Sequence, residues 1–134
     1  MRARLIALTD EARIALEGGE RVIERLPFRV GRESRVTSPA PWIRGERRQR
    51  TTPQLNDLYL VDDAEPFNVS REHFQIEAEG DRFFLSDRGS ACGTIVEERT
   101  VGGERTFARV EIREHDVIIV GHAVSPFVFK FRIA

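Results

Sequence analysis

The chain has 134 residues, of which 40% are hydrophobic and 32% are charged, and its formal net charge is −1. This composition is typical of one globular domain with its own core, and it excludes a disordered chain. A charge so near zero gives no general attraction to nucleic acid or to an anionic membrane.

The chain contains a single cysteine, so it cannot form an internal disulfide. That usage fits a reducing compartment. The N-terminal residues lack the apolar core of a signal peptide, and no apolar run is long enough to cross a membrane. We therefore expect a soluble domain located in the cytoplasm.

Short apolar runs with period-two alternation dominate the chain, and this pattern predicts β-strands. In chain order they lie at 4–8, 21–26, 28–30, 58–61, 73–79, 82–85, 108–113, 117–120 and 127–133. Phe74, Ile76 and Ala78 are expected to face inward. No segment predicts a long helix, so the fold class is an all-β sandwich or barrel. The alternative is a mixed α+β domain with a helix near residues 10–17.

Residues 33–54 interrupt this pattern with three prolines and five arginines against two glutamates. They predict a long loop, and a loop of this length is commonly functional or disordered. One hypothesis is that its arginines bind nucleic acid. The net charge of the chain argues against that, and favours a solvated loop or one that reaches an acidic protein partner. The arginines concerned are Arg44, Arg47, Arg48 and Arg50.

Two motifs bring anion-binding groups to the ends of predicted strands. The stretch "VGRES" ends a strand just before Arg32, and "NVSREHFQIE" places Ser70 and Arg71 ahead of another strand. A guanidinium presents donors that match two phosphate oxygens, and a hydroxyl adds a compact third contact. These three residues can therefore form an anion site.

Four motifs in order carry a resemblance to a known family. They are "GR", "SREHFQIE", "RFFLSDRGSACGTIV" and "IREHDVIIVGH". Together they resemble the forkhead-associated (FHA) domain, from about Phe28 to Ile133. The resemblance implies a sandwich of about eleven strands whose loops at one end bind phosphothreonine peptides without catalysis.

The resemblance also assigns roles to individual residues. It makes Arg32 the phosphate-contacting arginine, Ser70 the hydroxyl contact and Arg71 the basic neighbour. Two further peptide-contacting positions depart from the family pattern, because Ala91 replaces a small hydroxyl residue and Cys92 replaces an asparagine. A thiol cannot reproduce the paired contacts of an amide. The residues expected to shape and support the site are Gly31, His73, Gly89, Ser90, Gly93 and Thr94.

The function implied by the resemblance is a non-enzymatic phosphothreonine-peptide-binding module in bacterial Ser/Thr-kinase signalling, formed by one domain over residues 1–134. Its partner would be a phosphothreonine-containing protein, such as a Ser/Thr kinase or its substrate. Ala91 and Cys92 leave an alternative open. The chain is then a degenerate FHA domain that binds its partner independently of phosphate.

Two rival chemistries depend on the cysteine and the histidines. Cys92 with His73 suggests a thiolate–imidazole pair, but no third orienting group or oxyanion site can be placed beside them, so we expect no enzyme. His115 and His122 show no ligand-type spacing with that pair. We therefore expect neither a metal ion nor another cofactor.

Overall fold

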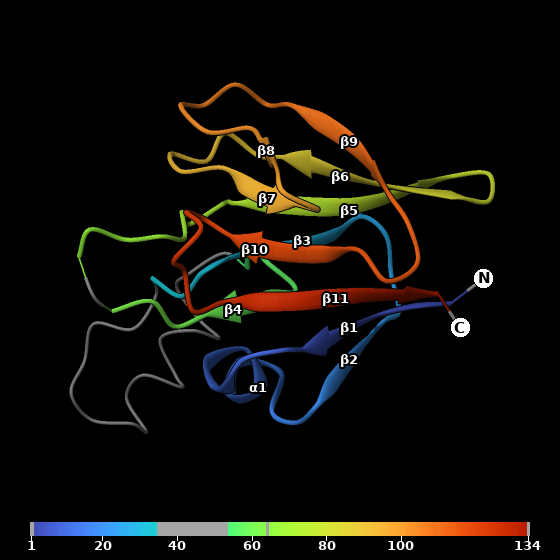
Figure 1. Ribbon diagram of the computed structural model, residues 1–134, viewed down its shortest axis with the longest axis horizontal. Helices are drawn as coiled ribbons and strands as arrows, with labels where there is room; N and C mark the ends of the chain where they lie inside the picture. The colour runs from blue at the N-terminus through green and yellow to red at the C-terminus, as the bar shows by residue number, and fades with distance from the viewer. Residues whose placement is uncertain (1, 35–53, 64, 134) are drawn as a thin grey trace.

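A computed structural model of the protein describes residues 2–34, 54–63 and 65–133. Within these residues lie eleven strands and one short helix, and the strands form two packed sheets (Figure 1). The predicted all-β sandwich is confirmed. The helix that the α+β alternative required does exist, as α1 (Asp10–Leu16), but it is the one helix of the described residues and it accompanies a β-sandwich.

The first sheet contains six of the described strands, in the spatial order β2-β1-β11-β10-β7-β8. Neighbouring strands in it are antiparallel, and Leu5 pairs with Phe131, so the two ends of the chain lie side by side. Its strands are β1 (Ala3–Ala7), β2 (Glu20–Ile23), β7 (Thr94–Val96), β8 (Arg99–Val101), β10 (Val117–Val120) and β11 (Val128–Ile133).

The second sheet contains the other five described strands, in the order β4-β3-β5-β6-β9. β3 and β4 run parallel, and the remaining pairs are antiparallel. Its strands are β3 (Phe28–Arg32), β4 (Leu58–Leu60), β5 (Phe74–Glu79), β6 (Arg82–Asp87) and β9 (Arg109–Ile112).

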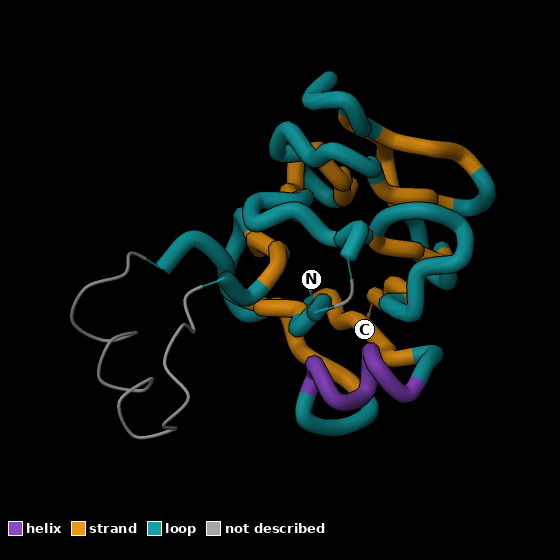
Figure 2. Tube along the Cα trace, turned by 90° about the vertical axis from the view of Figure 1, so that its left-hand side faces the viewer, coloured by secondary structure: helices purple, strands orange, loops and turns teal. Residues whose placement is uncertain are grey.

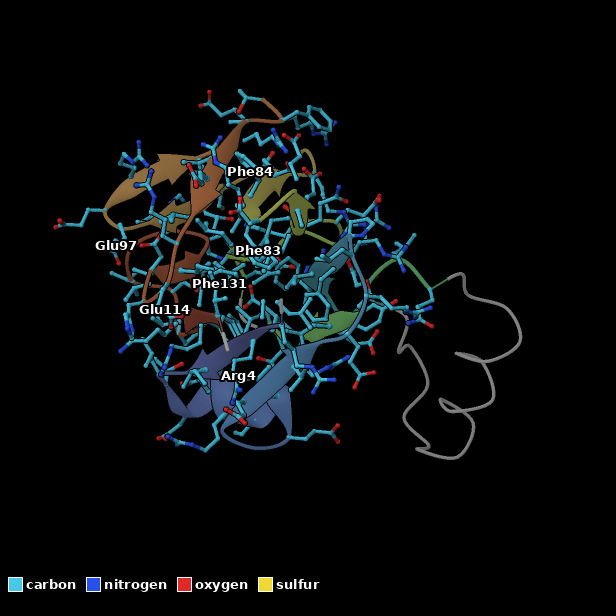
Figure 3. All side chains as sticks on the ribbon, turned by 90° about the vertical axis from the view of Figure 1, so that its right-hand side faces the viewer. Arg4, Phe83, Phe84, Glu97, Glu114 and Phe131 are labelled. Atoms are coloured by element: carbon cyan, nitrogen blue, oxygen red, sulfur yellow. The ribbon has the colours of Figure 1, made fainter. Side chains whose placement is uncertain are left out.

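The core lies between the two sheets and follows the alternation of the strands. Phe129 of β11 and Ile76 of β5 are fully buried. The rings of Phe83 and Phe131 meet edge to face across the sandwich, with their centroids 5.3 Å apart (Figure 3). The expectation that Ala78 faces inward was wrong, because the β5–β6 hairpin extends past the other strands there (Figure 1) and Ala78 is exposed.

The two ends of the sandwich differ. The chain termini and the β5–β6 hairpin lie at one end (Figure 1). The loops that follow β3, precede β5 and follow β6 and β8 gather at the opposite end, which faces the viewer in Figure 2. Among the described residues, no helix has the length and apolar character needed to cross a membrane.

Candidate functional site

Arg32 is the last residue of β3, at the loop end of the sandwich. Its Nε donates a hydrogen bond to the carbonyl oxygen of Val69 at 2.9 Å. Its guanidinium carbon lies 4.0 Å from the centroid of the Phe67 ring, a cation–π contact. These contacts orient the guanidinium, and its terminal nitrogens have no partner among the described residues.

Gly31 allows β3 and the loop before β5 to approach closely. A Cβ on Gly31 would lie 2.0 Å from the carbonyl oxygen of Arg71 and 2.7 Å from the side-chain amide of Asn56. That amide is buried, and its Nδ2 donates to the same Arg71 oxygen at 2.8 Å. A side chain at position 31 would therefore displace the backbone that carries Ser70 and Arg71.

His73 joins two loops of the site from inside the protein. Its Nδ1 accepts the N–H of Ser70 at 2.9 Å, and its Nε2 donates to the carbonyl oxygen of Gly93 at 2.6 Å. The ring is fully buried, and burial lowers the pKa of His73 despite the opposing influence of that carbonyl and of Asp87. The imidazole is therefore neutral and carries its proton on Nε2.

The turn after β6 is organised by Asp87. Its carboxylate accepts the N–H of Gly89 at 2.9 Å, the N–H of Ser90 at 3.1 Å and the Ser90 hydroxyl. The Ser90 Oγ in turn accepts the N–H of Gly93 at 3.0 Å. Thr94 follows, and its buried hydroxyl has no hydrogen-bond partner among the described residues.

Ser70 connects this turn to the loop before β5. Its Oγ accepts the backbone N–H of Ala91 at 3.0 Å, so its own proton remains available to a ligand. The side chain of Arg71 is exposed and has no partner among the described residues.

A pocket of about 390 Å³ lies where these loops meet. That volume is within the usual range of ligand sites. Four of the five predicted peptide-contacting residues line it, and Cys92 does not. Its lining residues are Arg32, Ser70, Arg71, Glu72, Arg88, Gly89, Ala91, Arg105 and Phe107.

Four of these lining residues were missed by the sequence reasoning: Glu72, Arg88, Arg105 and Phe107. Arg88 adjoins Asp87 in the motif, which is a signal that could have found it. Its guanidinium is nearly buried, donating to Leu55 O at 2.9 Å and lying 3.2 Å from a carboxylate oxygen of Glu72. Burial lowers its pKa, but a guanidinium stays charged in proteins.

Cys92 lines a second pocket, of about 500 Å³, which also includes His122. Ala91 lines both pockets, so they are adjacent. The thiol donates a long hydrogen bond to the carbonyl oxygen of Phe67 at 3.5 Å. Burial, together with the negative charge of Asp62, raises the pKa of Cys92, which disfavours the thiolate.

The geometry does not form a cysteine–histidine pair. Both ring nitrogens of His73 are engaged by the backbone at Ser70 and Gly93, and neither bonds to Cys92. The described part of the chain also contains no group of three or more histidine, cysteine or carboxylate side chains that could hold a metal ion. Most of the predicted loop at 33–54, including Arg44, Arg47, Arg48 and Arg50, lies outside the described residues.

The fold and the site together define a class of protein: a β-sandwich whose loops at one end form a basic pocket suited to an anion. The model of the FHA domain family matches residues 28–121. The chain therefore belongs to the FHA domain family.

Solved FHA structures share this fold. The FHA domain of the CT664 protein from Chlamydia trachomatis is 20% identical, with a TM-score of 0.61 and coverage of 100% of this chain and 99% of that one. The kinase-interacting FHA domain of the phosphatase KAPP from Arabidopsis is 22% identical, with a TM-score of 0.64 and coverage of 99% and 93%.

EmbR from Mycobacterium tuberculosis, solved with a low affinity phosphopeptide, is 20% identical with a TM-score of 0.58. That match covers 99% of this chain and 24% of EmbR. No curated protein matches the sequence.

Proposed function

We propose that this domain is a non-enzymatic module that binds phosphothreonine-containing peptides in Ser/Thr-kinase signalling. The observation that carries the proposal is the pocket in which Arg32, Ser70 and Arg71 converge. Membership of the FHA family supports the choice of a phosphorylated peptide as ligand. The phosphopeptide complex of the structurally similar EmbR supports the same choice of ligand. The kinase-interacting FHA domain of KAPP supports the role in kinase signalling.

The chemistry of the pocket fits a phosphate group. A phosphothreonine carries a charge of about −1.5 to −2 and three acceptor oxygens. Arg32 is held in place by Val69 and Phe67, so a phosphate on its terminal nitrogens costs little further ordering. The Ser70 hydroxyl adds a neutral donor, and the exposed Arg71 adds a second positive charge.

The two adjacent pockets suggest a path for the peptide. With the phosphate beside Arg32, the peptide main chain would cross the turn at Ala91 and Cys92 and reach the second pocket. Asparagine at position 92 would offer that main chain a donor and an acceptor, whereas the thiol offers only weak ones. We therefore expect the domain to bind the peptide main chain more weakly than it would with asparagine at position 92.

A second candidate function follows from the same position. If the turn at Ala91 and Cys92 cannot hold a peptide, the domain is a degenerate FHA domain that binds its partner without phosphate. The observation in its favour is that the thiol contacts Phe67 within the protein.

The experiment that separates the two functions is selection from a degenerate peptide library, since the preferred sequence is not known in advance. Matched libraries carry phosphothreonine, phosphoserine or threonine at one fixed position. We expect the wild type to retain the phosphothreonine library and Arg32→Ala to lose it. Arg99→Ala, which removes the same charge from an exposed arginine outside both pockets, is the control and should still retain it. Equal retention of the phosphorylated and plain libraries would support the phosphate-independent function instead.

A further inference from the structure

We propose that Arg105 forms a second anion-binding position in this pocket, so that the preferred ligand carries another negatively charged group close to the phosphothreonine. The proposal rests on the proposed function of the pocket and specifies its ligand further. The second group is a carboxylate or another phosphate, which share the geometry that a guanidinium binds.

Arg105 reaches the pocket on a loop, residues 102–108 between β8 and β9, that is bound to the turn after β6. The N–H of Glu104 donates to the carbonyl oxygen of Ala91 at 3.0 Å, and the N–H of Arg105 donates to that of Ser90 at 3.0 Å. The loop backbone is thus fixed to the turn after β6, of which Gly89 and Ala91 line the pocket.

Close packing joins the same two segments. A Cβ on Gly102 would lie 2.2 Å from the carboxylate carbon of Asp87, and a Cβ on Gly89 would lie 2.8 Å from the ring of Phe107. The glycines thus allow a contact too close for other residues. Phe107 is 66% exposed and lines the pocket beside Arg105.

The loop keeps an unfavourable backbone conformation. Glu104, Arg105 and Phe107 have φ values of 51°, 60° and 57°, in the left-handed region that costs free energy for residues other than glycine. Such conformations persist where surrounding contacts impose them, and they concentrate at functional sites. Here the N–H groups of Glu104 and Arg105 are bonded to Ala91 and Ser90, and Phe107 packs against Gly89, so these contacts hold the loop with Arg105 at the pocket.

The charge balance of the pocket leaves room for a second anion. Of its four arginines, Arg88 is occupied by Glu72 and by backbone oxygens, and Glu72 is the one carboxylate among the lining residues. Arg32, Arg71 and Arg105 have no carboxylate partner in the described part of the chain. One phosphate of charge about −1.5 to −2 neutralises at most two of these three cations.

The positions of the three arginines indicate which of them a bound phosphate leaves without an anionic partner. Arg71 follows Ser70 in the loop before β5, and Arg32 at the end of β3 donates its backbone N–H to the Ser70 carbonyl oxygen at 2.9 Å. Arg105 is carried by a different segment, the loop between β8 and β9, which is bonded to Ser90 and Ala91 in the turn after β6. A phosphate on the first three residues therefore leaves Arg105 for a neighbouring group of the same peptide.

The test is a cycle of peptide and protein changes measured by titration calorimetry. All peptides share the sequence selected from the library. One carries phosphothreonine alone, a first series adds an aspartate at each nearby position in turn, and a second series adds a second phosphothreonine at each of the same positions. The proteins are the wild type, Arg105→Ala, Arg105→Lys and the charge-matched control Arg99→Ala. Thermal unfolding of each variant checks that it is folded.

We expect one added charge to tighten binding to the wild type about two- to fivefold. Arg105→Ala reduces this ratio to about one, Arg105→Lys gives an intermediate ratio, and Arg99→Ala retains it. Comparison of the aspartate and the second phosphate identifies the source of the charge. A wild type that gains nothing at any position, or a gain that survives in Arg105→Ala, overturns the inference. If phosphothreonine alone confers no binding, the proposed function itself has failed.

Discussion

His73 connects the loop that carries Ser70 to the turn that carries Gly93, and it does so only in its neutral form. A proton on Nδ1 would face the N–H of Ser70, with no acceptor there. Burial lowers the pKa of His73, while Asp87 and Asp62 oppose and Arg88 reinforces the shift. The protein therefore stabilises the neutral imidazole relative to the unfolded chain.

This lowered pKa predicts a loss of stability in mild acid. The contribution of His73 is complete above its unfolded pKa of about 6.5 and declines as the pH falls below that value, because the unfolded chain then binds a proton that the folded protein does not. The free energy of unfolding should fall by up to about 1.4 kcal/mol per pH unit from this group. Urea unfolding at a series of pH values from about 7.5 to 5.5 measures it.

The control for that series is His122→Gln, a change at an exposed histidine. We expect it to keep the pH dependence, whereas His73→Gln should reduce it along with the overall stability. A direct reading comes from the NMR titration of the imidazole signals in the wild type. If His73 titrates above pH 6.5 in the folded protein, the assigned neutral form is wrong.

We expect a substitution at Cys92 to raise the affinity of the site for phosphopeptide. Cys92→Asn should tighten phosphopeptide binding about five- to tenfold, because an amide can hold the peptide main chain and a thiol cannot. Cys92→Ser, which adds a hydroxyl but no amide, should gain less. Calorimetry with one phosphopeptide compares the three proteins. An unchanged affinity in Cys92→Asn would mean that the peptide does not cross this turn.

At the scale of residues, the sequence motifs predicted a basic pocket but not its full lining. Arg32, Ser70 and Arg71 were identifiable because they follow or precede strands in motifs with a clear spacing. Arg105 and Phe107 were not, because their approach depends on left-handed backbone at residues other than glycine. The residues with this conformation are Glu104, Arg105 and Phe107, and none of these residue types predicts positive φ from sequence.

At the scale of elements, the site depends on how closely β3 approaches the loop before β5. Gly31→Ala should lower the free energy of unfolding by about 1–3 kcal/mol, because the added methyl group would meet the Arg71 carbonyl oxygen. It should also weaken phosphopeptide binding, since that backbone carries Ser70 and Arg71.

Gly19→Ala is the matched control for this change. A Cβ at Gly19 meets nothing within 4 Å, so the stability should change by less than about 1 kcal/mol and the affinity should be unchanged. Chemical denaturation and calorimetry of both variants make the comparison. Equal stability of the two alanine variants would contradict the close approach seen at Gly31.

The strands were predicted unevenly, for physical reasons that can be named. β5 and β11 alternate clearly and were found from periodicity. β7 and β8 have only three residues each, too few to show a clear alternation. The turn between them has Glu97 and Glu98 at positive φ instead of the Asn-Gly pair that predicts a hairpin from sequence. The parallel pairing of β3 with β4 is set by tertiary contacts and has no local signal.

At the scale of the whole molecule, the sandwich needs more of the chain than the region matched by the family model. Residues 28–121 lack β1, β2 and β11, which are three of the six described strands of the first sheet. β11 supplies Phe129 and Phe131, and β1 supplies Leu5, all of them fully buried. Burying each such side chain contributes about 1.5–3 kcal/mol, against a total stability of about 5–15 kcal/mol for a domain.

A fragment of residues 28–121 should therefore fail to fold. We expect it to show no cooperative thermal transition and little protection of its backbone amides from hydrogen exchange, whereas the intact chain shows both. A cooperative transition in the fragment would mean that the strands contributed by the chain ends are accessory to the core.

The central claim is that Arg32 makes peptide binding by this domain depend on the phosphate group. Calorimetry on one matched pair of peptides tests this dependence most directly. The peptide selected from the library is titrated with phosphothreonine and with plain threonine into the wild type and Arg32→Ala. We predict that the phosphate tightens binding to the wild type about a hundredfold, and that Arg32→Ala removes most of this gain. Equal affinity for the two peptides, or a gain unchanged in Arg32→Ala, would contradict the claim.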